Sequence, residues 1–262
     1  MLIATWNVNS LRVRLPQLVE WLQQTPLDVL ALQETKTTDE AFPRAAIERL
    51  GYDVIFSGQK TYNGVATLLR RSAASSADVA RDIPGLQDPQ RRVLALTVGS
   101  GERALRVINV YVPNGQSVDS DKYFYKLDWL DKFRTWLADE ATRYPHVVVL
   151  GDFNIAPEDR DVHDPILWQG QVLVSERERA ALRAVLAQGY SDVFRKFPQA
   201  DKSFSWWDYR GGGFRRNHGL RIDLIIATEA AAQCCTESHI DREPRMVERP
   251  SDHTPVLATF DI

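Results

Sequence analysis

Acidic, amide, phenol and imidazole side chains follow several short apolar runs in this chain. Asp152 and Asn154 come after the run 146–150, and Glu34 follows the run 29–32. The comparable positions elsewhere are Asn7, Tyr111, Asn114, Asp223, Asp252 and His253. Short apolar runs bounded by turn residues are typical of buried strands, and strand ends on a rigid scaffold can hold polar groups in a shared cleft. We therefore expect these side chains to converge on one site.

Carboxylates gathered in this way would hold a hard metal ion. If the first and last strands are neighbours, Glu34 and Asp252 lie beside Asn7, and two close carboxylates do not both ionise cheaply without a cation. Such oxygen ligands suit Mg²⁺, with Mn²⁺ as a substitute. Zn²⁺ suits the chain less, because its two cysteines are adjacent and no two histidines have helical ligand spacing. The alternative for Glu34 is a local cap or a surface ion pair.

The same set of residues could hydrolyse a phosphodiester. A hydrogen bond from His253 to Asp223 would fix the imidazole tautomer, so that the ring can donate to a phosphate oxygen. Asp152 could take the proton of an attacking water or supply one to the leaving oxygen, with Asn154 orienting the water. The alternative for His253 is an ordinary structural histidine.

Two further residues could bind the phosphate itself. Tyr111 and Asn114 could donate hydrogen bonds to it and stabilise the charge that develops there, although Tyr111 could equally be an aromatic residue at the edge of the core. This chemistry needs no Ser or Cys nucleophile. The chain also has no glycine-rich nucleotide loop of the Walker or Rossmann type, which argues against kinase or dehydrogenase activity.

Strands separated sometimes by helices and sometimes by tight turns must position these residues. Apolar and alternating runs predict strands at 2–6, 29–32, 94–98, 105–112 and 146–150, with two more between 52 and 69. Helical spacing predicts helices at 15–22, from about 39 to 50, at 122–141, and from a capping box at 175 to 186. This order indicates a single α/β domain over residues 1–262, with two mixed β-sheets packed face to face and helices outside. The irregular segments 154–174 and 206–219 are expected to flank the cleft.

Composition sets limits on the function. With 262 residues, 44% of them hydrophobic, the chain can bury a substantial core. A net charge of −3 argues against coating nucleic acid by bulk electrostatics, but it allows a basic rim around an acidic site. The neighbours Cys234 and Cys235 are poorly placed for a disulfide, and no signal or transmembrane run is evident, so we expect a soluble cytoplasmic protein.

Eight short motifs occur in one order from one end of the chain to the other. They are TWNVN at 5–9, LQETK at 32–36, QRRV at 90–93, NVYVPNG at 109–115, GDFNI at 151–155, FSWWDYR at 204–210, GLRID at 219–223 and PSDH at 250–253. In this order they resemble the exonuclease III family of DNA repair nucleases, within the endonuclease/exonuclease/phosphatase superfamily that includes DNase I. The resemblance implies a four-layered α/β sandwich. It also implies a monomer that uses Mg²⁺ to cleave double-stranded DNA at abasic sites or at gapped, nicked, recessed or blocked 3′ ends.

The resemblance also assigns roles to individual residues. The implied roles are metal binding for Asn7, Glu34, Asp252, Asp152 and Asn154, and catalysis for Asp152, Asn154, His253, Asp223, Tyr111 and Asn114. Within the family, different acids have been assigned as the base that deprotonates the water. We expect Asp152 to be that base in this chain. At position 9 this chain has asparagine, where some family members have an acid that helps to hold the metal. The difference weakens Asn9 as a direct metal ligand. Bacterial relatives commonly have asparagine at this position.

DNA-contacting residues follow from the same resemblance. Trp206 and Leu220 match positions that wall a pocket for a flipped-out abasic sugar, where their shapes could exclude an intact base; ordinary core packing is the alternative for both. Backbone contacts are expected from Arg91, Arg210, Arg221 and Lys122. On the loop 163–170, Trp168 and Gln169 are expected to tune the balance between internal cutting at abasic sites and trimming of 3′ ends.

Two other functions remain open on the sequence alone. A noncatalytic nucleic-acid-binding regulator on the same fold should have lost catalytic residues, and none is replaced here beyond the ambiguous Asn9. A phosphatase of lipid headgroups or inositol phosphates would use the same chemistry. The motifs at 90–93 and 219–223 favour DNA over such substrates, and no membrane-binding segment is evident.

Overall fold

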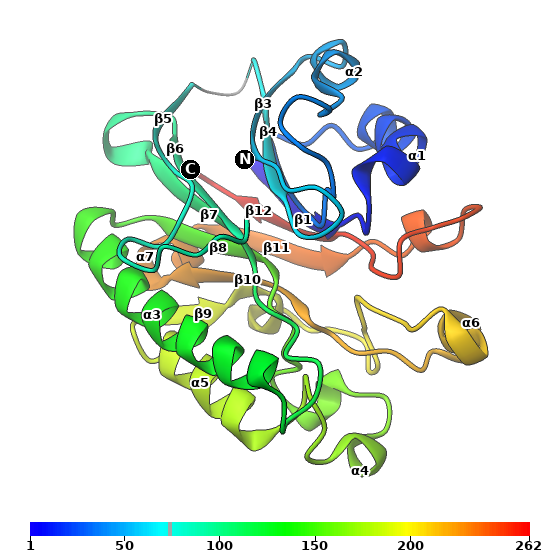
Figure 1. The fold of residues 1–262 in the computed structure, drawn as a ribbon. Coiled ribbons are helices and arrows are strands. Elements are labelled where there is room, and N and C mark those ends of the chain that lie inside the picture. The colour runs from blue at the N-terminus through cyan, green and yellow to red at the C-terminus, as the bar shows by residue number, and fades with distance from the viewer. Residues whose placement is uncertain (73–74) are drawn as a thin grey trace.

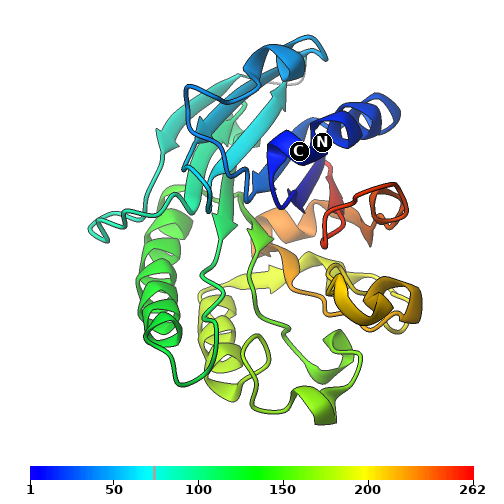
Figure 2. The same ribbon diagram turned by 45° about the vertical axis from the view of Figure 1, so that its right-hand side comes forward.

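Two six-stranded sheets pack face to face, and the longer helices cover their outer sides (Figures 1 and 2). The computed structural model describes residues 1–72 and 75–262. The first sheet has the order β11-β12-β1-β2-β4-β3, and the second has the order β5-β6-β7-β8-β10-β9. Both sheets are mixed: β1 runs parallel to β2 and antiparallel to β12, while β8 runs parallel to β7 and antiparallel to β10. The predicted four-layered α/β architecture is confirmed.

The strands are short, as is usual for sheets that pack on one another. Those of the first sheet are β1 (Leu2–Asn7), β2 (Val29–Gln33), β3 (Tyr52–Ser57), β4 (Val65–Arg70), β11 (Cys235–Ile240) and β12 (Val256–Phe260). Those of the second are β5 (Ser76–Ala80), β6 (Val93–Val98), β7 (Leu105–Tyr111), β8 (Val147–Asp152), β9 (Tyr190–Asp192) and β10 (Asp223–Thr228). Apolar side chains from both sheets, including Ile3, Val29, Val107 and Val148, form a shared core between them.

Helices α3 and α5 lie on the outer side of the second sheet, and α1 and α2 lie outside the first (Figures 1 and 2). The helices are α1 (Leu11–Gln24), α2 (Arg44–Glu48), α3 (Asp121–Arg143), α4 (Pro165–Trp168), α5 (Glu176–Leu186), α6 (Gly213–Arg216) and α7 (Glu229–Gln233). Helix α5 begins at the predicted capping box, in which the side chains of Ser175 and Glu178 each accept from the other's backbone N–H. Within the described residues, no helix is long and apolar enough to cross a bilayer.

Three local predictions differ from the structure. The helix expected from about residue 39 begins at Arg44, directly after Pro43, which restricts the backbone of the residue before it. Helix α1 begins at Leu11, earlier than its apolar face suggested. Strand β5 was missed because it is an edge strand with mostly exposed side chains and hence no apolar alternation.

The register of the strands aligns the polar residues at one end of the sheets. Tyr111 at the end of β7 is the Cα partner of Asp152 at the end of β8, which is in turn the partner of Asp223 at the start of β10. In the other sheet, Asn7 at the end of β1 pairs with Gln33 on β2, so Glu34 follows immediately. The first and last strands are neighbours, because β1 pairs with β12, so the condition for bringing Asp252 near Asn7 is met.

Candidate active site

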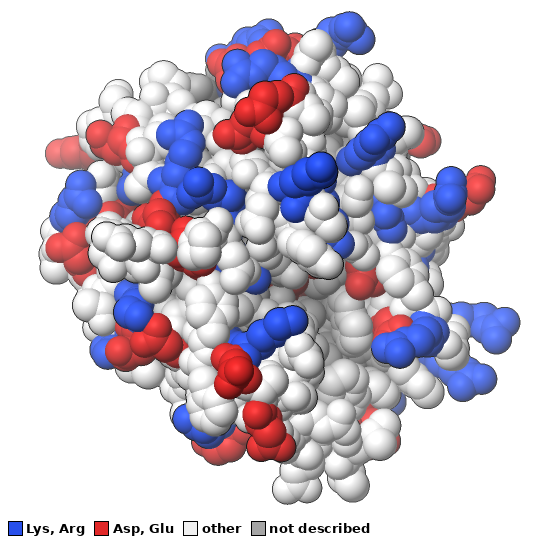
Figure 3. All heavy atoms as spheres, in the orientation of Figure 1, with Lys and Arg blue, Asp and Glu red and all other residues white. Residues whose placement is uncertain are grey.

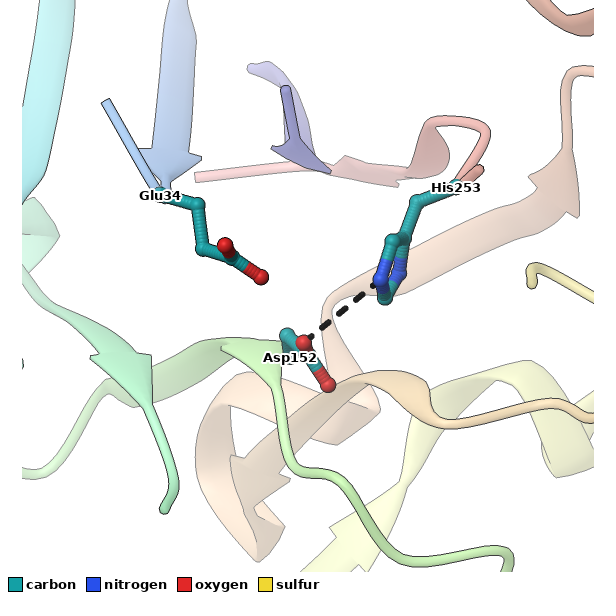
Figure 4. Close-up of side chains that lie close together, drawn as sticks. All are labelled: Glu34, Asp152 and His253. Carbon is teal, nitrogen blue, oxygen red and sulfur yellow. Dashed lines mark ion pairs between the residues drawn. The ribbon is translucent and has the colours of Figure 1, made fainter. Parts of the chain in front are cut away.

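The carboxylates of Glu34 and Asp152 and the imidazole of His253 point toward one another from three different segments (Figure 4). Their nearest ligand atoms all lie within 4.8 Å of one another. Asn7 joins the two acids, since its Nδ2 donates to Glu34 Oε1 and to Asp152 Oδ2, at 2.9 Å in each case. Each side chain comes from a strand end or the loop just before a strand, as the sequence predicted for a shared cleft.

Asp152 is buried and held in place from two sides. Its Oδ1 accepts the backbone N–H of Asn154 at 2.8 Å, and its Oδ2 accepts Asn154 Nδ2 at 3.1 Å in addition to Asn7. Burial disfavours the charged form and, with the nearby charge of Asp223, raises the pKa of Asp152 above its ordinary value, whereas His253 opposes the shift. Gly151 is needed before it, because a Cβ there would lie 1.9 Å from the carbonyl oxygen of Val110.

His253 sits between two carboxylates. Its Nδ1 lies 2.9 Å from Asp223 Oδ2, and its Nε2 lies 3.7 Å from Asp152 Oδ2. Ser205 Oγ donates to Asp223 at 2.6 Å and so fixes that carboxylate. Burial by itself would lower the pKa of His253, but the charges of Asp223 and Asp152 raise it to about 10. The ring is therefore cationic near neutral pH and can donate from Nε2 toward the cleft.

Glu34 lies at the other side of the cluster, beside a lysine. Lys36 Nζ is 2.8 Å from Glu34 Oε2. Burial opposes ionisation of Glu34, but Lys36 and the hydrogen bond from Asn7 lower its pKa below the ordinary value, so the carboxylate is charged. Glu34 and Asn154 both adopt left-handed backbone conformations, with φ of 51° and 50°. Such conformations cost free energy in non-glycine residues and often occur at functional sites.

Asp252 lies outside this cluster of ligand atoms. Asn9 Nδ2 donates to its Oδ1 at 2.8 Å, and Trp206 Nε1 donates to its Oδ2 at 3.1 Å. Asn9 is linked to Lys36 as well, because Lys36 Nζ donates to Asn9 Oδ1 at 2.5 Å. These bonds place Asp252 at the rim of the site rather than against Glu34.

Tyr111 and Asn114 complete the site on the β7 side. Burial, followed by the charges of Glu34 and Asp152, raises the pKa of Tyr111 well above its ordinary value, so its phenol keeps its proton and can donate it in a hydrogen bond. Asn114 Nδ2 donates to Asn154 Oδ1 at 2.9 Å. The two asparagines and Asp152 thus form one hydrogen-bonded chain.

The donor set fits a hard divalent cation. Glu34 and Asp152 offer carboxylate oxygens, the ligands that Mg²⁺ and Mn²⁺ prefer. His253 is cationic and suits an anion better than a metal. In this arrangement the amides of Asn7 and Asn154 donate to the carboxylates, so they position the ligands. Of the five residues predicted to bind metal, Glu34 and Asp152 contribute to the group of close potential ligand atoms.

A groove with a cationic border surrounds the site. A cavity of about 690 Å³ is lined by Tyr111, Asn114 and Lys122, among others, and a second of about 580 Å³ is lined by Arg12, Lys36 and Lys60. Figure 3 shows acidic atoms inside a hollow on the right half of this face, with Lys and Arg side chains above it and to its right. Cationic side chains thus border an acidic hollow, an arrangement that the net charge of the chain allowed.

The segments carrying α4 and α6 meet beside the site. Leu220 forms isolated bridges to Val162 and to Trp206. Trp168 and Trp206 are in edge-to-face contact, with ring centroids 6.4 Å apart, and both pack on the apolar cluster that contains Leu220. Trp206 thus lies next to Asp252, with Trp168 beside it.

Two predictions for DNA-contacting residues are corrected by burial. Leu220 has no exposed surface, so it supports Trp206 from within the cluster and does not line a pocket. Arg221 is also buried: its Nε lies 2.7 Å from Asp161 Oδ1 and its Nη2 lies 2.7 Å from Asp192 Oδ2. If Arg221 swung outward, Asp192 would lose this cation and Asp161 would keep only Arg195, so Arg221 cannot serve as a contact to a DNA backbone. The remaining predicted residues Arg91, Arg210, Lys122 and Gln169 are exposed.

Sequence reasoning missed three residues that hold the site together. Ser205 and Lys36 lie inside the matched motifs but were given no role, although each is next in space to an acid of the site. Lys126 was also missed, and it is fully buried beneath the loops of Asn114 and Asn154. A signal for it existed, because Lys126 shares the buried helical stripe of α3 with Leu130, Phe133 and Leu137.

Comparisons with known proteins identify the family and the fold of this chain. The sequence model of the Endonuclease/Exonuclease/phosphatase family matches residues 4–253. The chain is 35% identical to exodeoxyribonuclease III of Haemophilus influenzae, over 99% of this chain and 100% of that protein. Its fold matches the 3′ phosphatase NExo from Neisseria, solved with a product DNA hairpin, at a TM-score of 0.95 and 46% identity, with both chains fully covered. It also matches an AP endonuclease from Archaeoglobus fulgidus at a TM-score of 0.93 and 37% identity, again over the whole of both chains.

Proposed function

Because the chain belongs to the endonuclease/exonuclease/phosphatase family, we propose that it is a DNA repair phosphodiesterase of the exonuclease III type. Its substrates are double-stranded DNA with abasic sites, or with gapped, nicked, recessed or blocked 3′ ends. The observation that carries the proposal is the placement of one buried carboxylate, Asp152, between the Asp223–His253 pair and the Asn7–Glu34 pair. This combination can activate a water and bind a phosphate at the same place.

The site would hold Mg²⁺, with Mn²⁺ as a substitute, through Glu34 and Asp152. Asn7, Asn154 and Asp252 surround these ligands and could add contacts through water. Such an ion would polarise the phosphate and neutralise charge developing on it.

The chain's own residues supply proton transfer and orientation. The raised pKa of Asp152 suits a general base that takes a proton from water near neutral pH, and Asn154 orients that water. His253 and Tyr111 keep their protons, so they can donate hydrogen bonds to the phosphate oxygens, with Asn114 beside them. Asp223 holds the imidazole in the orientation that this donation requires.

DNA would lie across the cationic groove, with Trp206 against the sugar at the cleavage site. Lys122 in the larger cavity and the exposed Arg91 and Arg210 would contact phosphates along the duplex. Trp168 would narrow the pocket by its contact with Trp206, and we propose that it and Gln169 set the preference between internal abasic sites and 3′ ends.

We further propose that residues 1–262 act as one domain and as a monomer in the cytoplasm. The sheet that pairs β1 with β12 supports a single domain, since it unites the two ends of the chain. Free, unbridged Cys234 and Cys235 are compatible with a reducing compartment.

The test is cleavage of three labelled duplexes, carrying an internal abasic site, a one-nucleotide gap or a 3′-phosphate nick, with and without Mg²⁺. Metal-dependent hydrolysis of at least one of them is expected, and competition by abasic duplex but not by phosphoinositide identifies DNA as the substrate. DNA binding without hydrolysis under any divalent metal would instead indicate a noncatalytic regulator. Hydrolysis of phosphoinositide alone would indicate a lipid phosphatase.

A further inference from the structure

A buried ion pair lies directly beneath the loops of the candidate active site. Lys126 on α3 and Glu178 on α5 have no exposed side-chain surface, and Lys126 Nζ lies 2.5 Å from Glu178 Oε1. Burying two charges is costly, and an apolar pair of similar volume often stabilises a protein as well or better. Overall stability is therefore a weak explanation for this pair, and its other contacts indicate a different role.

The ammonium group of Lys126 also binds the backbone of two site residues. It donates to the carbonyl oxygen of Asn154 at 2.7 Å and to that of Asn114 at 3.1 Å. With Glu178, these acceptors use all three of its hydrogens. The chain of side-chain amides described above runs from Asn114 through Asn154 to Asp152. One buried cation thus fixes the backbone at both asparagines of that chain.

Glu178 connects the same cation to the segment that carries α4. Its Oε1 accepts the backbone N–H of Leu173 at 3.0 Å, and its Oε2 accepts that of Ser175 at 3.2 Å. The loop of Asn114 packs closely on the stem of Lys126, since a Cβ at Gly115 would lie 3.2 Å from Lys126 Cδ. Three separate segments therefore depend on the position of one ammonium group.

We propose that Lys126 is a positioning residue for hydrolysis, which holds the backbone of Asn114 and Asn154 so that their amides keep Asp152 oriented toward the attacking water. The inference rests on the proposed function of that site. Lys126 does not touch substrate, and it acts through the two asparagines. A small shift of a catalytic group is enough to matter, because misplacement by about 1 Å can slow a reaction about 100-fold.

The deciding variant removes both charges, as Lys126→Met with Glu178→Gln, so that no unpaired charge is buried and the glutamine oxygen can still accept the backbone N–H of Ser175. A matched control exists on the same helix. Glu140, near the other end of α3, forms a similarly buried pair with Arg106 on β7 at 2.5 Å, and Arg106→Met with Glu140→Gln removes both of these charges. Glu140 also contacts the exposed Arg143, which stays in solvent in the control. Both double variants and the wild type are compared by thermal unfolding, kcat, KM and DNA affinity.

We expect the Lys126 double variant to lose about 10- to 100-fold in kcat with little change in KM or DNA affinity, while the Arg106 control keeps the wild-type kcat at a similar melting temperature. Equal kcat in both double variants would overturn the proposal. Lys126→Arg is a second test, which remains available if the double variant does not fold. It keeps a cation opposite Glu178. Its planar fork does not reproduce the three-way geometry of an ammonium, so its kcat should also fall; a wild-type kcat in folded Lys126→Arg would also overturn the proposal.

The same variants are assayed on bis(p-nitrophenyl) phosphate, which reports phosphodiester hydrolysis without DNA recognition. If the wild type hydrolyses this compound but no DNA, the proposed DNA function fails, while the ratio of variant to wild-type turnover still decides the role of Lys126. If the wild type hydrolyses neither, the proposed function and the role of Lys126 are both refuted.

Discussion

Asp152 and Asp223 are Cα partners on the antiparallel strands β8 and β10, and His253 lies between their carboxylates. The register of these two strands therefore sets the distance between Asp152, the proposed base, and Asp223. Asp223 orients the imidazole that is proposed to donate a hydrogen bond to the phosphate. A shift of this register by a single residue would turn one of the acids to the opposite face of the sheet. The chemistry of the site thus depends on strand pairing as much as on the identity of the residues.

Removing the proposed base should abolish most turnover without affecting DNA binding. We expect Asp152→Ala to lower kcat by about 10²- to 10⁴-fold, because general-base catalysis is lost. Single-turnover cleavage and a binding titration on the same duplex measure the two effects. Asp128→Ala is the control, since Asp128 is exposed on α3, and it should behave as wild type. Undiminished turnover in Asp152→Ala would remove the assigned role.

Metal dependence should distinguish Glu34 from Asp252. A chelator should abolish hydrolysis, and added Mg²⁺ or Mn²⁺ should restore it. Because Glu34 belongs to the cluster of ligand atoms, we expect Glu34→Gln to raise the Mg²⁺ concentration for half-maximal activity by about 10-fold or more, and Asp252→Asn to raise it less. Calorimetric metal titrations provide an independent readout. A larger effect from Asp252 would mean that the ligand set is wrong.

The ion pair of His253 should make stability depend on pH in one direction. The pKa of His253 is raised from 6.5 to about 10, so its stabilising contribution is fully present below about pH 6.5 and is lost as pH rises toward about 10. The free energy of unfolding of wild type minus that of His253→Gln should therefore shrink by about 1 kcal/mol or more between about pH 6 and about pH 9.5. Urea unfolding without metal measures this difference. A constant or growing difference would contradict the assignment.

The aromatic contact beside the site should affect substrate preference. Trp168→Gly removes the ring that lies against Trp206, so we expect it to raise cleavage at internal abasic sites relative to trimming of 3′ ends, and Gln169→Gly to have a smaller effect of the same sign. Ile166→Gly is the control, because Ile166 is strongly exposed on the same short helix. The ratio of the two activities on matched duplexes is the measurement. If Trp168→Gly and Gln169→Gly both leave this ratio unchanged, the proposed role of the loop is refuted.

Arg221 should matter for stability and Lys122 for DNA affinity. Replacing Arg221 with Met leaves Asp192 without this cation and Asp161 with Arg195 alone, and we expect a loss of about 3 kcal/mol in urea unfolding. Lys122→Ala should instead leave stability unchanged. It should reduce the slope of log DNA affinity against log salt concentration by about one, which corresponds to the loss of one phosphate contact. The opposite pattern would restore Arg221 as a DNA contact.

Sequence alone predicted those parts of the molecule that have a local signal. The apolar runs that end in Glu34 and Asp152 identified strands β2 and β8, and the capping box at Ser175 identified the start of α5. The convergence of these acids could be anticipated because a strand end defines where a side chain leaves the sheet.

Burial could not be predicted in the same way. Arg221 and Leu220 stand in a loop motif whose sequence is equally compatible with an exposed or a buried side chain, and the partners Asp161 and Asp192 are distant in sequence. The role of Asn7 was also out of reach, since an amide can offer a ligand oxygen or donate hydrogen bonds. The position of its neighbours decides between these two uses.

The pairing of β1 with β12 makes the site dependent on two segments that are far apart in the sequence. Asn7 emerges from a ribosome long before His253 and the strand that follows it. Until then β1 has an open edge, which can associate with other unpaired strands. A growing polypeptide that has not yet released His253 therefore lacks one of the groups on which the site depends.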